Sequence, residues 1–195
     1  MASNDEKQLI EQCKSGDRAA FDALVRSYEK RVYNLAYRLS GNYDEANDIS
    51  VDAFMRVFQA LRLFRGDSHF STWLFRIVTN VYLDRRKRMQ NKQHLSLEEY
   101  IELEESSVSR QIEDTAPTPV EVVEQNERSQ ILQNAINNLP DYQRAMVVLY
   151  HTEGLSYEEI ASIFSLPIGT VKSRLNRARL TLKNKLEPLK ELFGN

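Results

Sequence analysis

The sequence is poor in the residues that interrupt helices and in those that build cross-links. Its 195 residues include 6 glycines, 5 prolines, 1 cysteine and 3 histidines. The prolines, at positions 117, 119, 140, 167 and 188, all stand where a helix could begin or end. A single cysteine excludes an internal disulfide framework, and with three scattered histidines it argues against a Cys/His metal site.

Other signatures are also missing. No apolar run approaches the roughly 18 residues that a membrane-spanning helix needs. The first residues, MASNDEKQLI, lack the basic and apolar regions of a signal peptide. We find no Gly-rich phosphate loop, nucleophile elbow or His-x-x-x-His pair. We therefore expect a cytoplasmic protein that is not an enzyme, binds no cofactor or metal and does not insert into a membrane.

The net charge of −2 hides an uneven distribution. Residues 94–125 carry nine acids and one base, whereas the rest of the chain carries 25 bases and 19 acids. Apolar residues recur every 3.6 positions over long segments, and no stretch alternates like a strand for long. We therefore predict an all-α protein with two small helical domains, 1–93 and 126–195, joined by a flexible acidic linker, 94–125.

The segment 155–186 gives the clearest functional signal. It is predicted to form two helices joined by a tight turn, and the second carries six Lys or Arg. Val171, Leu175, Ala178 and Leu182 form one apolar stripe on that second helix, which must pack inward. This pattern is typical of a helix-turn-helix.

The face opposite that stripe carries Ser173, Asn176 and Arg177, side chains that can read base edges in a major groove. The flanking cations suit phosphates; they are Lys172, Arg174, Arg179, Lys183 and Lys185. An ordinary helical hairpin with a solvated basic face is the alternative. Because no Asp or Glu occurs from 160 to 186, we favour a DNA-reading helix.

Helix boundaries in the first domain follow from capping residues. Asp17 is a good N-cap for a long helix that Gly41 ends, and Asp44 can cap the next helix. Ser71 or Thr72 is predicted to cap the last helix of this domain.

Boundaries in the second domain are as clear. A helix is predicted from 122 to 138, where Pro140 breaks it, and another from 141 to 152. Ser156 and Glu159 form a capping box ahead of the helix-turn-helix, whose second helix has Pro167 in its first turn.

The run TWLFRIVTNVYLDRRKR mixes aromatic and basic residues. Trp73, Phe75 and Tyr82 stand among arginines and a lysine, an arrangement that suits stacking on unpaired bases. Alternatively, Trp73 and its apolar neighbours Leu74 and Ile77 belong to the core and the cations form a solvated helix end. Residue chemistry alone does not decide between the two.

Three runs resemble bacterial sigma-70-type factors. LPDYQRAMVVLYHTEGLSYEEIASIFSLPIGTVKSRLNRAR resembles region 4, and DEANDISVDAFMRVFQAL and FRGDSHFSTWLFRIVTNVYLDRRKR resemble regions 2.2 and 2.3–2.4. The order and the short linker are similar to those of the extracytoplasmic-function (ECF, group IV) subfamily. The resemblance implies a transcription initiation factor that recruits core RNA polymerase to promoters.

The resemblance implies that the helix from Asp48 to Leu61 docks on the β′ subunit of core polymerase. The implied contacts are Asp48, Asp52, Phe54, Arg56, Phe58 and Leu61. Val51 departs from the family, which usually has Gln there.

Two promoter-contacting sets are also implied. The −10 element would be recognised and opened by Arg65, Ser68, His69, Phe70, Trp73, Arg76, Asn80, Arg85, Arg86 and Arg88. The −35 element would be read as duplex by Thr170, Lys172, Ser173, Arg174, Asn176, Arg177 and Arg179.

The remaining expectations concern partners. The linker would thread toward the polymerase active-site cleft, with both the β′ and β subunits as partners, and an anti-sigma factor would hold the protein inactive. No stable homo-oligomer is expected. Two other functions stay open: a stand-alone helix-turn-helix regulator, which would bind symmetric half-sites as a dimer, and an adaptor that binds only protein.

Overall fold

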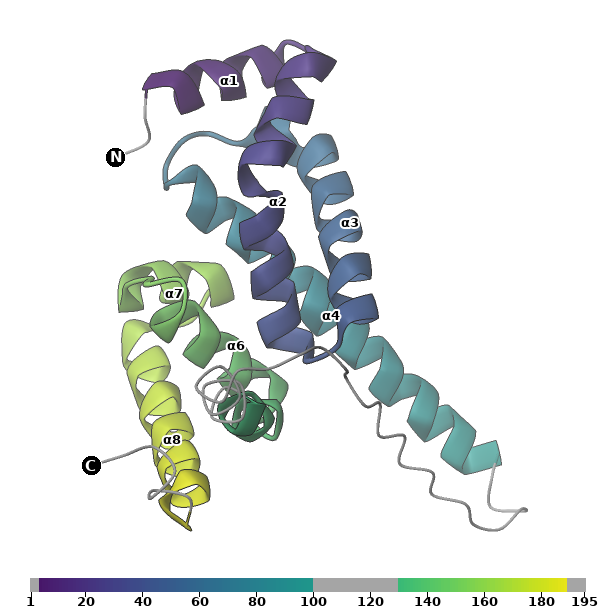
Figure 1. The fold of residues 1–195 in the computed structure, drawn as a ribbon, viewed down its shortest axis with the longest axis vertical. Helices are drawn as coiled ribbons and strands as arrows, with labels where there is room; N and C mark the ends of the chain where they lie inside the picture. Colours follow the sequence, from purple (N-terminus) through teal and green to yellow (C-terminus); the bar gives the residue numbers. More distant parts are fainter. Residues whose placement is uncertain (1–3, 100–129, 189–195) are drawn as a thin grey trace, which may run out of the picture.

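The computed structural model describes residues 4–99 and 130–188, and the side chains of 92–99 are not described. The described residues are helical with short connections, which confirms the predicted all-α class (Figure 1). The helices are α1 (Asn4–Lys14), α2 (Arg18–Ser40), α3 (Tyr43–Ala60), η1 (Leu61–Leu63), α4 (Phe70–Glu99), α6 (Asp141–His151), α7 (Tyr157–Phe164) and α8 (Ile168–Leu186). Residues 130–137 are also helical.

The N-terminal domain is built around α2, α3 and α4. Figure 1 shows α2 and α3 side by side, with α1 across one end and α4 passing behind them. Asp17 caps α2 by accepting hydrogen bonds from the backbone N–H of Ala19 and Ala20, as predicted. Gly41 ends α2 at φ 72°, the left-handed conformation that favours glycine.

Two predicted caps in this domain are wrong. Asn42 rather than Asp44 caps α3, because its side chain accepts from the Glu45 N–H while Asp44 lies in the first turn. Ser71 and Thr72 lie inside α4, which begins at Phe70. Thr72 is buried, and its hydroxyl donates to Glu159 of the C-terminal domain. The residues near Thr72 in sequence do not predict this contact.

Helix α4 continues to Glu99, into the segment predicted as linker. Its C-terminal half extends away from the N-terminal domain (Figure 1). The rest of the predicted linker, with the part of the predicted 122–138 helix that precedes residue 130, lies outside the described residues.

The C-terminal domain packs α7 and α8 against α6. The middle of α6, from Arg144 to Leu149, is buried. The capping box of Ser156 and Glu159 begins α7, and Ser165 ends it in the left-handed region at φ 52°. Pro167 is the residue that precedes α8, and its carbonyl accepts from the N–H of Thr170.

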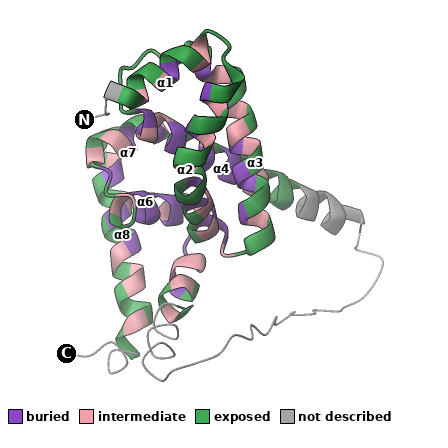
Figure 2. Ribbon diagram, turned by 45° about the horizontal axis from the view of Figure 1, so that its top comes forward, coloured by how far each residue is buried: buried purple, intermediate pink, exposed green. Residues whose placement is uncertain are grey.

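The two domains touch in this structure. Helix α6 contacts α2 and α4, and α7 contacts α4. Buried residues gather where these helices meet (Figure 2), and those of both domains belong to one continuous apolar cluster. Among the described residues, no helix is long and apolar enough to cross a membrane.

Candidate nucleic-acid interface

The outer face of α8 presents the side chains that the sequence assigned to base reading. Ser173, Asn176 and Arg177 are exposed, whereas Val171 and Leu175 are fully buried beneath them. The N-cap region of the helix carries no acid, so the positive end of its dipole is unopposed. The geometry therefore offers a polar, positively charged face that a major groove can accommodate.

A ring cluster holds two of the predicted phosphate contacts. The rings of Tyr150 and Tyr157 stack at 5.0 Å; Arg179 lies 4.7 Å above the first and Lys172 lies 5.5 Å from the second. Arg179 also donates through Nε to His151 Nε2 at 3.1 Å. These contacts hold the Arg179 guanidinium in place at the edge of the DNA-reading face.

This cluster shifts the titration of its members. The pKa of Tyr157 is lowered, first by its hydrogen bond with Tyr150 and then by Arg179. Burial, followed by the charge of Arg179, lowers the pKa of His151, which favours the neutral ring as acceptor. The cluster could not be predicted from local sequence patterns because its members come from three helices.

A second charged face lies on α3. Asp48 is exposed and Asp52 is half-buried, and both pair with Arg85 of α4, at 2.7 and 2.9 Å. Arg56 pairs with Asp84 at 2.9 Å. Asp48, Asp52 and Arg56 thus share the side of α3 that faces α4. Arg85, predicted as a −10 contact, is bound to the acids predicted as polymerase contacts.

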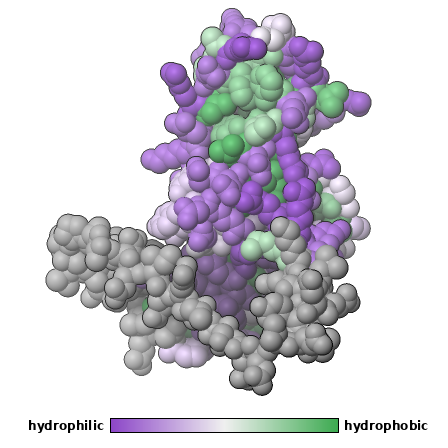
Figure 3. Space-filling model, turned by 90° about the vertical axis from the view of Figure 1, so that its right-hand side faces the viewer, coloured by the Kyte–Doolittle hydropathy of each residue, from purple (hydrophilic) through white to green (hydrophobic). Residues whose placement is uncertain are grey.

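An apolar groove adjoins these charges. It encloses about 380 Å³ and is lined by Phe21, Val51, Phe54, Met55, Phe58 and Gln59. Phe58 is 58% exposed and Val51 53%, and hydrophobic side chains gather on this face of the N-terminal domain (Figure 3). Leu61, by contrast, is 3% exposed and supports α3 from within, so it offers no surface to a partner here.

The residues assigned to the −10 element fall into two groups. Exposed members are Arg65, Ser68, His69, Arg76, Asn80 and Arg88. Phe70 is buried, and Trp73 is half-buried against the rings of Phe64 and Phe70. The loop before α4 and the outer side of its first turns therefore form one accessible strip, which we call the α4 strip.

The stacking interpretation of the aromatic run is wrong for Phe75 and Tyr82. Both side chains are fully buried, because the helical period turns them to the same side as Leu74, Val78 and Val81. Arg86 also turns inward, where it donates to the Ser40 carbonyl at 3.3 Å and lies beside Tyr82. Rings and cations that alternate in sequence are thus separated in space.

Comparison with known proteins identifies the family of this chain. Residues 24–92 match the family described as Sigma-70 region 2, and residues 129–182 match Sigma-70, region 4. The chain is 37% identical to the ECF RNA polymerase sigma factor SigW of Bacillus subtilis over 94% of its length and 97% of that protein. This chain is a sigma-70 family protein of the ECF subfamily.

Other ECF sigma factors match over similar lengths. The ECF RNA polymerase sigma-E factor of Escherichia coli is 36% identical, over 94% of this chain and 95% of that protein. Among solved structures, the sigma factor RpoE in complex with the anti-sigma factor NepR from Bartonella quintana aligns with a TM-score of 0.61 at 26% identity, over 86% of this chain and 96% of that one. CnrH, solved with the cytosolic domain of CnrY, aligns with a TM-score of 0.64 at 24% identity, over 92% and 96% of the two chains, and shows the same fold.

As an ECF sigma factor, the protein directs RNA polymerase and is not an enzyme. The helix-turn-helix made by α7 and α8 lies within the region 4 match, and α3 and most of α4 lie within the region 2 match. The predicted family and the predicted class of function are confirmed.

Proposed function

We propose that the two domains form a two-point grip on a promoter while α3 holds core RNA polymerase. The observation that carries this proposal is the separation of three exposed faces: the α3 face, the α4 strip and the outer face of α8. Each face has the chemistry for a different target, namely protein, unpaired bases and duplex.

The α3 face is assigned to the β′ subunit of core polymerase. The exposed Asp48 and the half-buried Asp52 place their carboxylates beside the apolar groove of Phe54 and Phe58. Protein interfaces commonly combine an apolar centre with a charged rim. Val51, which replaces the usual Gln, enlarges the apolar part, so we expect contact there to depend more on burial than on a polar bond.

Charge reversal tests this assignment. Asp48→Lys with Asp52→Lys should weaken binding to core polymerase at least about tenfold while circular dichroism stays native, because buried charge pairs at interfaces are costly to break. Asp44→Lys is the matched control, since Asp44 is an exposed acid in the first turn of the same helix. Equal affinities of the double variant and the control for core polymerase would show that α3 does not contact the polymerase.

The α4 strip is assigned to the opened −10 element. Ser68 and His69 can hydrogen-bond base edges, Arg76 can hold the backbone, and the half-buried Trp73 offers one ring edge. Asn80 and Arg88 extend the strip along the helix, so a displaced strand can follow α4.

The outer face of α8 is assigned to the −35 duplex. Ser173, Asn176 and Arg177 would contact base edges, and Lys172 and Arg174 would contact phosphates. Thr170 accepts from the Ser173 hydroxyl through its carbonyl at 3.0 Å, which orients that side chain at the start of the helix.

We further infer an anti-sigma factor as regulator and the β and β′ subunits as polymerase partners. The sigma factor RpoE, with which this chain aligns, was solved in complex with the anti-sigma factor NepR. The acidic segment 94–125 is proposed to run toward the polymerase cleft, where its charge would mimic that of a nucleic acid. A location in the cytoplasm stays a prediction.

The decisive experiment mixes the full chain with core polymerase and a promoter library. Specific initiation, together with co-elution with core polymerase, is the expected result. Tight duplex binding at symmetric half-sites by the chain alone, without co-elution, would favour the stand-alone regulator instead.

A further inference from the structure

The loop between η1 and α4 begins and ends at buried aromatic rings. Phe64 precedes the loop and is 8% exposed, and Phe70 follows it and is 3% exposed. Their rings meet edge to face, with centroids 5.5 Å apart. Residues 65–69 between them are exposed, so the chain leaves one buried point and returns to the same point.

Two further rings extend this contact. The ring of Trp73 lies 5.2 Å from that of Phe64 and 5.7 Å from that of Phe70, and Tyr28 of α2 meets Phe70 edge to face at 5.3 Å. Aromatic pairs at such distances are favourable and fix the orientation of the rings. We call Tyr28, Phe64, Phe70 and Trp73 the loop cluster.

Helix α1 holds the loop cluster from outside. The Tyr28 hydroxyl donates to Glu6 Oε1, and Lys14 Nζ, at the other end of α1, lies 5.7 Å from the centre of the Phe64 ring. Burial, followed by the bond to Glu6, raises the pKa of Tyr28, so its hydroxyl remains a donor at neutral pH. Figure 1 shows α1 across the end of the domain from which the loop runs to α4.

Hydrogen bonds within the loop are local. The Ser68 hydroxyl and the Trp73 N–H both donate to the His69 carbonyl, at 3.3 and 3.1 Å. Gly66 takes φ 80°, which lets the chain turn between the two rings. Because these bonds join residues within four positions, the place of the loop relative to the rest of the domain depends on the loop cluster.

The loop carries side chains that are proposed to bind unpaired bases. Arg65, Ser68 and His69 are exposed on it. A loop that orders only when DNA arrives loses affinity to the cost of ordering, whereas a loop fixed during folding does not. The contacts that fix the loop ends therefore bear on base binding although they lie away from the bases.

We propose that Glu6 and Tyr28 are positioning residues for −10 recognition: α1 acts through them and Phe70 to hold loop 65–69 in the form that binds unpaired bases. This inference rests on the proposed role of the α4 strip. Helix α1 lies outside residues 24–92, which match region 2, so the inference adds an element to the −10 site.

Trp73 reports on this arrangement in the free protein, because it is the single tryptophan of the chain and belongs to the loop cluster. We expect Glu6→Ala to raise acrylamide quenching of Trp73 fluorescence by at least about 1.5-fold, because loosened rings admit the quencher. Asp5→Ala is the matched control, since Asp5 is an exposed acid in the same first turn.

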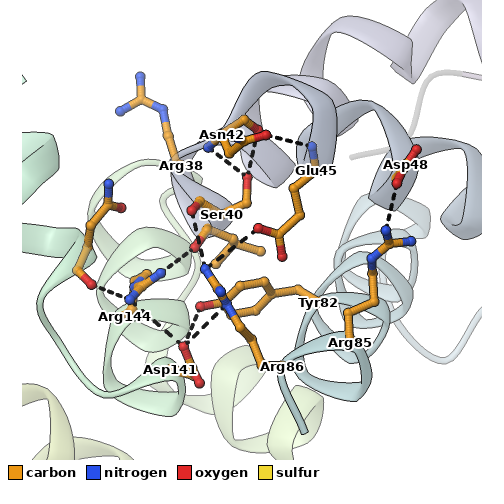
Figure 4. Close-up of polar contacts among 12 residues, drawn as sticks. Arg38, Ser40, Asn42, Glu45, Asp48, Tyr82, Arg85, Arg86, Asp141 and Arg144 are labelled. Carbon is orange, nitrogen blue, oxygen red and sulfur yellow. Dashed lines mark hydrogen bonds and ion pairs between the residues drawn. The ribbon is translucent and has the colours of Figure 1, made fainter. Parts of the chain in front are cut away.

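Tyr28→Phe should raise the quenching equally, since it keeps the ring and removes only the hydroxyl. Its matched control is Tyr82→Phe, which removes another tyrosine–carboxylate bond, from Tyr82 to Asp141 at 2.8 Å (Figure 4). Tyr82 lies about two turns beyond Trp73 on α4. Quenching that is the same in the parent and in both variants would overturn the proposal.

The functional test uses holoenzyme made with the full chain and a single-stranded oligonucleotide with the −10 sequence of a promoter selected from the library. A second strand differs from it at one base. Glu6→Ala should weaken binding of the selected strand by about threefold to tenfold, the range that one lost hydrogen bond gives, and should lower discrimination against the second strand. Affinity for core polymerase should stay unchanged.

Conservative and combined variants separate positioning from a general loss of stability. Glu6→Gln should restore discrimination, because its amide oxygen still accepts from the Tyr28 hydroxyl. The double variant Glu6→Ala with Tyr28→Phe should be no weaker than either single variant. Additive losses would show that the two residues act independently and would overturn the path through α1.

The outcomes distinguish this inference from the proposed function. Raised quenching with unchanged discrimination, measured well below the melting temperature of each variant, would overturn the positioning role and leave α1 a purely structural one. Failure of the parent protein to initiate with core polymerase would instead overturn the proposed function, while the quenching result would still decide whether α1 holds the loop.

Discussion

Helices α8 and α4 both carry many cations, yet they expose their functional residues differently. Helix α8 packs through one stripe, so Asn176 and Arg177 on the other side face solvent. Helix α4 has α2 and α3 on one side and α6 and α7 on the other, so Phe75 and Tyr82 are enclosed. The apolar stripe is therefore a better guide to a binding face than the mixture of residue types along the helix.

Removing an aromatic ring from α4 is the strongest test of this difference between α4 and α8. Phe75→Ala should destabilise the protein by about 3–5 kcal/mol, because it leaves a cavity in the core. Leu180→Ala on the exposed face of α8 should change stability by less than about 0.5 kcal/mol. Chemical denaturation measures both. A Phe75→Ala protein that is stable but fails in promoter opening would show that the Phe75 ring stacks on a base rather than supporting the core.

A substitution of Asn176 tests whether the exposed face of α8 reads bases. Asn176→Ala should shift preference at one or two base positions by about 1–3 kcal/mol per contact, because its amide is free to pair with a base edge. Binding to a −35 duplex library by the holoenzyme measures the shift. A uniform loss across all sequences would reassign Asn176 to backbone positioning.

Two arginines on α8 should differ in what they do. Arg174→Ala should weaken duplex binding and lower its salt dependence by about one unit, because Arg174 is the arginine assigned to a phosphate. Arg179→Ala should instead lower domain stability by about 0.5–1 kcal/mol, since it removes the cation from the Tyr150 ring. Salt titrations and thermal melts of both variants would separate the roles, and identical salt slopes for the two would show that Arg179 also binds phosphate.

The smallest effect is expected at His151. Its folded pKa lies below the ordinary 6.5, so its contribution to stability is full above that pH and is lost as pH falls through the folded pKa. From about pH 7.5 to about pH 5.5, the melting temperature should fall more in the parent than in His151→Gln, by less than about 2 °C. Parallel pH curves would mean that the Arg179 contact does not depend on a neutral ring.

Features set by neighbouring residues were predictable from the sequence. The Asp17 cap, the Ser156 capping box and the stripe of α8 depend on residues within a few positions of one another. Asn42 rather than Asp44 is the cap because residues two positions apart can each cap a helix, and the backbone geometry decides between them. Such errors move a boundary by one or two residues and leave the fold unchanged.

Features set by distant residues were not predictable from local pattern. The Tyr82–Asp141 hydrogen bond spans 59 positions, and the bond from Arg144 to the Leu39 carbonyl spans 105. Nothing near Arg144 in sequence distinguishes it from a surface arginine of an amphipathic helix. Its burial follows only from the way α6 is enclosed between the two domains.

On the proposed assignments of the α3 face and the α4 strip, the double ion pair of Arg85 would link polymerase binding thermodynamically to DNA binding. Asp48 and Asp52 both bind the guanidinium of Arg85. A polymerase cation that pairs with these acids would therefore release Arg85 to bind a phosphate. A phosphate that captures Arg85 likewise frees the acids. Binding at either face lowers the cost of binding at the other, and by reciprocity the two enhancements must be equal in size.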